Sequence, residues 1–136
     1  MLLVFFTCFQ FTLANFNVRC HSTLVDSERV DPIVNHGMIS SHTHTVVGGN
    51  AFNPTSRAAD LRASTCSTCD VQADNSAYWV PTLYNVDQNG VYQKVRQIEM
   101  RTYYLLGSGG RSWPKGFEAL FGNPSSRQEN HNVRYL

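Results

Sequence analysis

Closely spaced turn residues restrict this chain to short secondary-structure elements. Glycine, asparagine and proline interrupt the sequence repeatedly, at Pro32, Gly48-Gly49-Asn50, Asn89-Gly90, 107–110 and Gly122-Asn123-Pro124. A chain of 136 residues has the length of one domain with one modest core. Many short strands separated by turns predict a mainly β fold, a sandwich or an open barrel of short antiparallel strands with one or two short helices.

The segments between these turns have recognisable patterns. Strands are predicted over residues 40–47, 76–84 and 99–106, with a short helix as the alternative for residues 99–106. A hairpin is predicted over residues 86–95 with Asn89-Gly90 in its turn. Pro81 cannot donate a ladder hydrogen bond, so its strand is expected at a sheet edge or a bulge. Residues 56–63 predict a short helix with Ser56 as its N-cap. Residues 15–30 have no clear pattern.

The first fourteen residues have the character of a targeting segment. They carry no charged side chain, and their apolar run is too short to span a bilayer. The segment ends in Thr12-Leu13-Ala14, a small-x-small cleavage signal. We therefore expect a signal peptide over residues 1–14 and a single secreted β-rich domain over residues 15–136. A buried N-terminal strand and a misplaced start codon are the alternatives.

The small number of charged residues argues against nucleic acid as a partner. Only 15% of the residues are charged, the formal net charge is +1, and no block of Lys or Arg occurs. A nucleic-acid partner is therefore not expected. After cleavage of the signal peptide, no membrane association is expected either.

Three cysteines, Cys20, Cys66 and Cys69, remain after the predicted cleavage site. An odd number in an oxidising compartment suggests a free thiol, an intermolecular bridge or a partner outside this chain. Cys66-x-x-Cys69 could be half of a zinc site, a redox dithiol or part of a disulfide. Because there is no second Cys pair and no βαβ context, we favour a structural disulfide, with the pairing open.

His42-x-His44 is the sharpest local signal for chemistry. Side chains at i and i+2 of a strand share one face, so the two imidazoles could bind one divalent metal ion. A further ligand would be needed, and His36, His21, Asp31 and His131 are candidates. Imidazole suits zinc, copper, iron and nickel alike, which leaves the metal unnamed. The alternative is that one His faces solvent and the other hydrogen-bonds locally.

Aromatic and acidic residues supply further candidates. Tyr78, Trp79 and Trp113 belong to a larger aromatic set on which sugar rings could stack, and core packing is the alternative for each. Asp31 and Asp74 are candidate carboxylates for acid/base hydrolysis, with a weak signal.

Several motifs occur in an order that resembles a known family. They are Arg29-Val30-Asp31-Pro32-Ile33-Val34-Asn35, Ser41-His42-Thr43-His44, Gly48-Gly49, Ala63-Ser64-Thr65-Cys66-Ser67-Thr68-Cys69, Ser76-Ala77-Tyr78-Trp79-Val80-Pro81-Thr82-Leu83-Tyr84, Tyr103-Tyr104-Leu105 and Pro114-Lys115-Gly116-Phe117. Together they resemble the secreted fungal family catalogued as domain of unknown function nineteen-ninety-six, over about residues 20–123.

The resemblance implies an extracellular location, a β-rich domain and a cell-wall or polysaccharide context, but no mechanism. The family domain is longer, so the chain resembles its leading part, and truncation would place the partner of Cys20 in the missing portion. Open sheet edges would then be expected. Where the family usually has Lys after the Asp that precedes Ser-Ala-Tyr-Trp, this chain has Asn75 after Asp74.

Three functional hypotheses follow. The first is a secreted metal-assisted hydrolase of an extracellular or cell-wall polymer, with His42 and His44 as metal ligands or acid/base groups, supported by Asp31 or Asp74. The second is a non-catalytic cell-wall or carbohydrate-binding module that uses Tyr78, Trp79 or Trp113. The third is a fragment without independent function.

Overall fold

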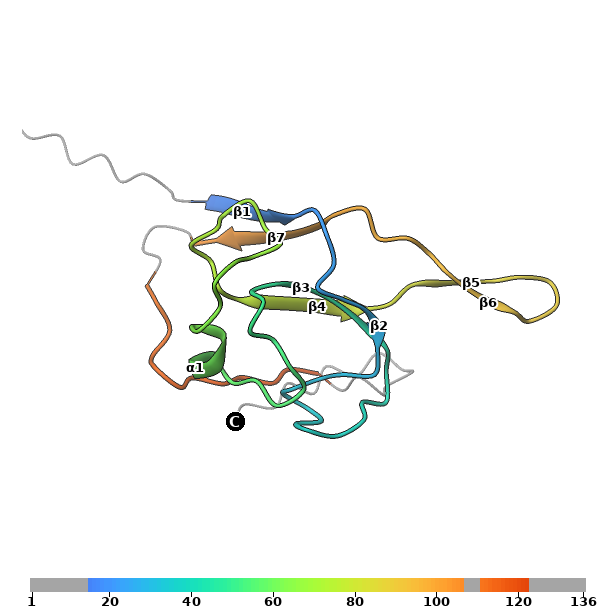
Figure 1. The fold of residues 1–136 in the computed structure, drawn as a ribbon, viewed down its shortest axis with the longest axis horizontal. Helices are drawn as coiled ribbons and strands as arrows, with labels where there is room; N and C mark the ends of the chain where they lie inside the picture. The colour runs from blue at the N-terminus through green and yellow to red at the C-terminus, as the bar shows by residue number, and fades with distance from the viewer. Residues whose placement is uncertain (1–14, 107–110, 123–136) are drawn as a thin grey trace, which may run out of the picture.

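The computed structural model describes residues 15–106 and 111–122 (Figure 1). The predicted signal peptide, the 107–110 connector and His131 lie outside these described residues. The described chain is mainly β, with short antiparallel strands in three small sheets and one short helix. The predicted fold class is confirmed.

The strands are grouped by pairing into two ribbons and a central sheet. The elements are β1 (Asn15–Cys20), β2 (Val25–Glu28), β3 (His44–Gly48), α1 (Ala58–Leu61), β4 (Ala77–Pro81), β5 (Tyr84–Val86), β6 (Tyr92–Lys94) and β7 (Met100–Leu105). β1 pairs with β7, the central sheet has the order β2-β3-β4, and β5 pairs with β6. The β5–β6 hairpin projects from the body of the molecule (Figure 1).

β3 is the centre of the structure. All five of its residues are buried, because it lies between β2 and β4. It begins at His44 and not at Ser40, a correction to the predicted strand. The chain before it forms local hydrogen bonds instead, since the Ser40 N–H donates to the Arg29 carbonyl (3.1 Å) and the His42 N–H donates to Ser40 Oγ (3.2 Å).

The edge strand and the hairpin agree with their sequence signals. β4 lies at the edge of the central sheet, as Pro81 predicts. The predicted strand over residues 76–84 is too long, because β4 ends at Pro81 and Tyr84 begins β5. In the hairpin turn, Asp87 Oδ1 accepts hydrogen bonds from the N–H groups of Asn89 and Val91, both at 2.9 Å. Gly90 has a φ of 78°, a conformation that glycine adopts without strain.

The helix is shorter than predicted and its cap differs. α1 has four residues, and Arg57 is its N-cap, with the Arg57 N–H donating to Asp60 Oδ2 at 2.8 Å. The assignment of Ser56 as N-cap is wrong. Its hydroxyl is engaged in the preceding turn, where it accepts from the Asn53 N–H (2.7 Å) and donates to the Ala51 carbonyl (3.2 Å).

A disulfide between Cys20 and Cys69 lies in the small core. The two cysteines face each other in an isolated β-bridge, and the His21 N–H donates to the Thr68 carbonyl at 3.1 Å. Cys66 is exposed and has a free thiol. The expectation that the partner of Cys20 lies outside the chain is therefore wrong, because the end of β1 meets the 66–69 loop.

The remaining core residues join β1, β3 and β7. Val18 and Val47 are buried beside the disulfide, and Tyr78, Met100 and Tyr104 pack against this cluster. In the described part of the chain, no helix is long and apolar enough to cross a membrane.

Candidate functional site

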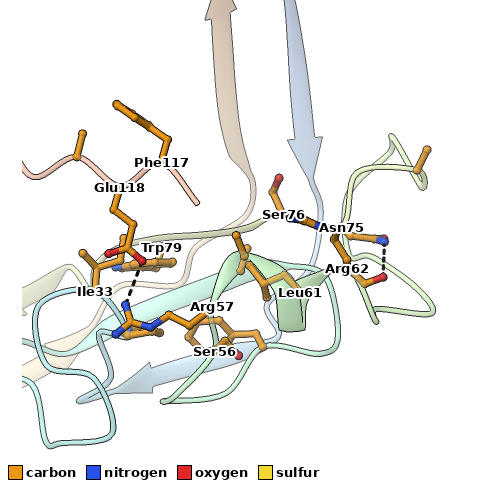
Figure 2. A pocket seen from close by; sticks show the side chains of 16 residues that line it. Ile33, Ser56, Arg57, Leu61, Arg62, Asn75, Ser76, Trp79, Phe117 and Glu118 are labelled. Carbon is orange, nitrogen blue, oxygen red and sulfur yellow. Dashed lines mark hydrogen bonds and ion pairs between the residues drawn. The ribbon is translucent and has the colours of Figure 1, made fainter. Parts of the chain in front are cut away.

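A pocket of about 590 Å³ lies beside α1. Its wall is formed by α1 with the residues just before it, by β4 with the residues just before it, and by the segment around residues 117–119, which passes over it (Figure 2). Pro32, Ile33 and Phe52 complete the wall. These parts of the chain are separated in sequence and meet through folding. Concave sites of this size with aromatic walls and a few polar groups are the usual form of a ligand site.

Aromatic side chains form one part of the pocket wall. Trp79 comes from β4 and contacts Phe52, with ring centroids 6.0 Å apart and planes inclined at 48°. Phe117 lines the pocket from the overlying segment, and its ring points away from Trp79 (Figure 2). Trp113 stacks on Phe117 with centroids 4.6 Å apart and lies outside the pocket wall, where 76% of its surface is exposed.

Polar side chains complete the pocket. Arg57 Nη1 lies 3.3 Å from Glu118 Oε1, so an ion pair connects α1 with the overlying segment (Figure 2). Arg62, Asn75 and Ser76 also line the pocket. The site therefore offers hydrogen-bonding groups next to an aromatic surface.

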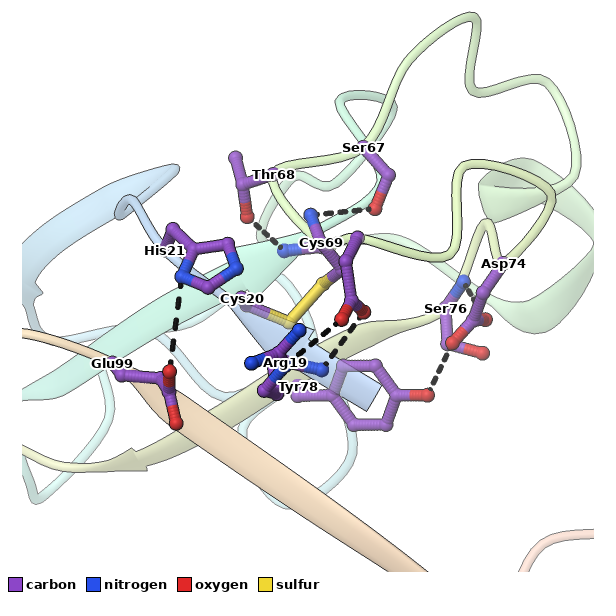
Figure 3. The surroundings of a disulfide bond; sticks show 12 residues. Arg19, Cys20, His21, Ser67, Thr68, Cys69, Asp74, Ser76, Tyr78 and Glu99 are labelled. Carbon is purple, nitrogen blue, oxygen red and sulfur yellow. Dashed lines mark hydrogen bonds and ion pairs between the residues drawn. A yellow bond between two sulfur atoms is a disulfide. The ribbon is translucent and has the colours of Figure 1, made fainter. Parts of the chain in front are cut away.

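Tyr78 lies on the other face of β4 from Trp79, since strand side chains alternate. Its hydroxyl donates to Asp74 Oδ2 at 2.5 Å and lies 2.6 Å from the Tyr104 hydroxyl. The Asp74 side chain also accepts from the Ser76 N–H at 2.9 Å (Figure 3). The ring of Tyr104 stacks on Phe16, with centroids 4.7 Å apart. This network joins the central sheet to the β1–β7 ribbon.

The network shifts two pKa values in opposite directions. Burial opposes ionisation of Asp74, but hydrogen bonds from Ser76 and Tyr78 outweigh it and lower the pKa of Asp74. Burial and the neighbouring Asp74 carboxylate raise the pKa of Tyr78 well above its usual value. Asp74 is therefore an ionised acceptor and Tyr78 a neutral donor at neutral pH.

The two histidines lie apart from the pocket. His44 is buried in β3, and His42 lies before the strand, with ring centroids 6.3 Å apart. His44 Nδ1 is 2.7 Å from the Val30 carbonyl oxygen, which can only accept, so Nδ1 carries the proton. Neither ring lines the pocket.

Asp31 is held in a local turn. Its Oδ1 accepts hydrogen bonds from the Ile33 and Val34 N–H groups, both at 3.0 Å.

Across residues 15–106 and 111–122, no three His, Cys, Asp or Glu side chains form a group suited to hold a metal ion. Of the predicted site residues, the structure thus brings only Trp79 into the pocket.

Sequence reasoning missed most of the pocket residues. Phe52, Arg57 and Glu118 belong to no motif, and Arg57 and Glu118 are 61 positions apart. Phe117 does occur in the family-like segment Pro114-Lys115-Gly116-Phe117. The occurrence of Phe117 in one of the ordered family-like segments was the sequence signal that could have identified it.

Fold and site define a mainly β, disulfide-linked domain with an aromatic-walled pocket. The family model described as Domain of unknown function (DUF1996) matches residues 31–136, so the chain belongs to this family and the resemblance is confirmed. No curated protein and no solved structure gives a significant match.

Proposed function

We propose that this chain is an extracellular carbohydrate-binding module that attaches to a cell-wall polysaccharide through the pocket beside α1. The observation that carries the proposal is the aromatic wall of Trp79 and Phe52 next to the polar groups of α1 and the overlying segment. Sugar rings have apolar faces edged by hydroxyl groups. A wall of this composition matches both parts of such a ligand.

An extracellular location is supported by the disulfide. Cys20 and Cys69 are bonded within the core, and structural disulfides persist in oxidising compartments. The apolar segment at residues 1–14 adds a sequence argument for secretion.

Binding to insoluble polysaccharide tests the proposal. The protein is incubated with insoluble β-glucan and with chitin, and the bound fraction is measured after sedimentation. Trp79→Ala should weaken binding about tenfold, since an aromatic contact and its buried area contribute roughly 1.4 kcal/mol. Trp79→Phe keeps a ring and should retain most of the binding.

Tyr92→Ala is the matched control. Tyr92 is an aromatic residue on the projecting hairpin, 70% exposed and outside the pocket wall. Its removal should leave binding unchanged. Circular dichroism checks that each variant is folded. If folded Trp79→Ala binds as well as the wild type, the pocket is not the binding site.

A metal-assisted hydrolase is a second candidate, favoured by the hydrogen bond of His44. Histidines that bind metals usually donate their other ring N–H to a carbonyl or carboxylate, as His44 Nδ1 does to Val30. His44 Nε2 and His42 would then supply two ligands of one divalent ion, and water molecules would complete its coordination.

Metal analysis distinguishes the two candidates. The purified protein is compared with His42→Ala, which removes the more accessible imidazole and spares buried His44. Metal present in stoichiometric amount in the wild type and lost from the folded variant would support the hydrolase. Polysaccharide binding that survives both chelator and His42→Ala would support the binding module.

A further inference from the structure

Positive charge exceeds negative charge in the pocket wall. The ionisable residues that line it are Arg57, Arg62 and Glu118, two arginines against one glutamate. Glu118 pairs with Arg57. Arg62 is exposed, and its guanidinium group has no ion-pair partner among the residues that the structure describes. One positive charge is therefore left at the site.

The Arg57–Glu118 pair is open to exchange. The two side chains are 45% and 61% exposed, and ion pairs this accessible to solvent contribute little to stability. A carboxylate on a ligand could replace Glu118 on Arg57 at little cost. Guanidinium groups bind carboxylates through two parallel hydrogen bonds, which gives such an exchange a geometric preference.

The aromatic wall lies in the same pocket as these guanidinium groups. Trp79 and Phe117 line the site together with Arg57 and Arg62. A ligand that fits this combination has a sugar ring with a carboxylate attached to it.

We infer that the pocket selects acidic polysaccharides, with a uronic acid unit packed on Trp79 and its carboxylate bound by Arg62 and Arg57. The inference rests on the proposed carbohydrate binding and adds the chemical class of the ligand. Neutral polymers would bind through the aromatic wall and hydrogen bonds to their hydroxyl groups, without the contact between carboxylate and guanidinium.

A matched pair of ligands tests the inference. Polygalacturonate and its fully methyl-esterified form share the sugar ring and differ in charge. Titration calorimetry should show the acid form binding about tenfold tighter, because hydrogen bonds between charged groups are stronger than those to a neutral ester. That advantage should shrink as the salt concentration rises, whereas binding of the ester should not change.

Two charge variants should act in opposite directions. Arg62→Gln should remove most of the preference for the acid form. Glu118→Gln should increase it, because Arg57 loses its competing carboxylate. In both variants, binding of the ester should change less than binding of the acid form. Arg96→Gln removes the same charge outside the pocket wall and should keep the preference.

The outcomes separate the two proposals. If acid and ester bind equally and Trp79→Ala weakens the binding of both, the selectivity is overturned and the carbohydrate site is retained. A loss in Arg96→Gln as large as in Arg62→Gln would also overturn it, because net charge and not the pocket would then set the preference. No binding of acid, ester or β-glucan would reject both proposals.

Discussion

Arg19 and Asp70 hydrogen-bond to each other through both backbone and side-chain atoms. Each is the direct neighbour of a cysteine of the disulfide. Asp70 Oδ1 accepts from the Arg19 N–H at 3.0 Å, and Oδ2 accepts from Arg19 Nε at 3.1 Å. The Asp70 N–H donates in return to the Arg19 carbonyl at 2.8 Å. These bonds hold the end of β1 against the 66–69 loop, next to Cys20 and Cys69.

Asp70→Asn should make the protein less sensitive to acid. The hydrogen bond from the Arg19 backbone N–H, helped by the Arg19 side chain, lowers the pKa of Asp70. A lowered pKa stabilises the fold above the unfolded value of about 3.9, and this contribution is lost as the pH falls through the folded pKa. Urea unfolding from pH 7 to pH 2 should therefore show a smaller loss of stability in the variant. An unchanged acid slope would contradict this role.

Cys20→Ser should destabilise the protein strongly. The bridge closes a loop with a sequence separation of 49, and chain entropy gives a bridge of that span about 4 kcal/mol. The free energy of unfolding, measured with urea, should fall accordingly.

Cys66→Ser is the matched control for this change. Its side chain is exposed and unbonded, so stability should be unchanged. A maleimide reagent applied to the folded chain from residue 15 onward should label the wild type once and Cys66→Ser not at all. Labelling of the Cys66→Ser variant would show that Cys20 and Cys69 are not bonded.

Tyr78→Phe should cost about 1 to 3 kcal/mol, because Asp74 and Tyr104 both lose a partner in a half-buried setting. Tyr104→Phe keeps the Tyr78–Asp74 bond and should cost less. Urea unfolding measures both. Equal costs would indicate that the Asp74 bond contributes little.

Gly49→Ala should be poorly tolerated. A Cβ at this position would lie 2.5 Å from the Asn75 carbonyl oxygen and from Ser64 Oγ, and overpacking of this kind costs about 1 to 3 kcal/mol. Gly90→Asn serves as the comparison, since nothing lies within 4 Å there and Asn tolerates a positive φ. Thermal unfolding by circular dichroism should show a large fall in midpoint only for Gly49→Ala.

Local signals predicted the local structure well. Asn89-Gly90 correctly predicted the hairpin turn, and Pro81 correctly predicted an edge strand. The strand predicted over residues 99–106 contains β7. Each of these features depends on a few adjacent residues, whose backbone preferences the sequence expresses directly.

Long-range contacts were not predictable in the same way. β1 has no clear strand pattern and is stabilised by pairing with β7, far along the chain. The Cys20–Cys69 pairing and the Arg57–Glu118 contact likewise depend on where the chain returns in space. The pocket is assembled from such contacts, so of the predicted ligand-binding residues only Trp79 was placed in its wall.

The disulfide has a consequence for how the chain responds to a protease. Arg57 and Arg62 are exposed and lie within the covalent loop that joins residues 20 and 69. Tryptic cleavage at either arginine would leave two fragments that migrate as one species until a reductant separates them. The segment that carries α1 can thus be cut beside the pocket while the two halves stay covalently attached.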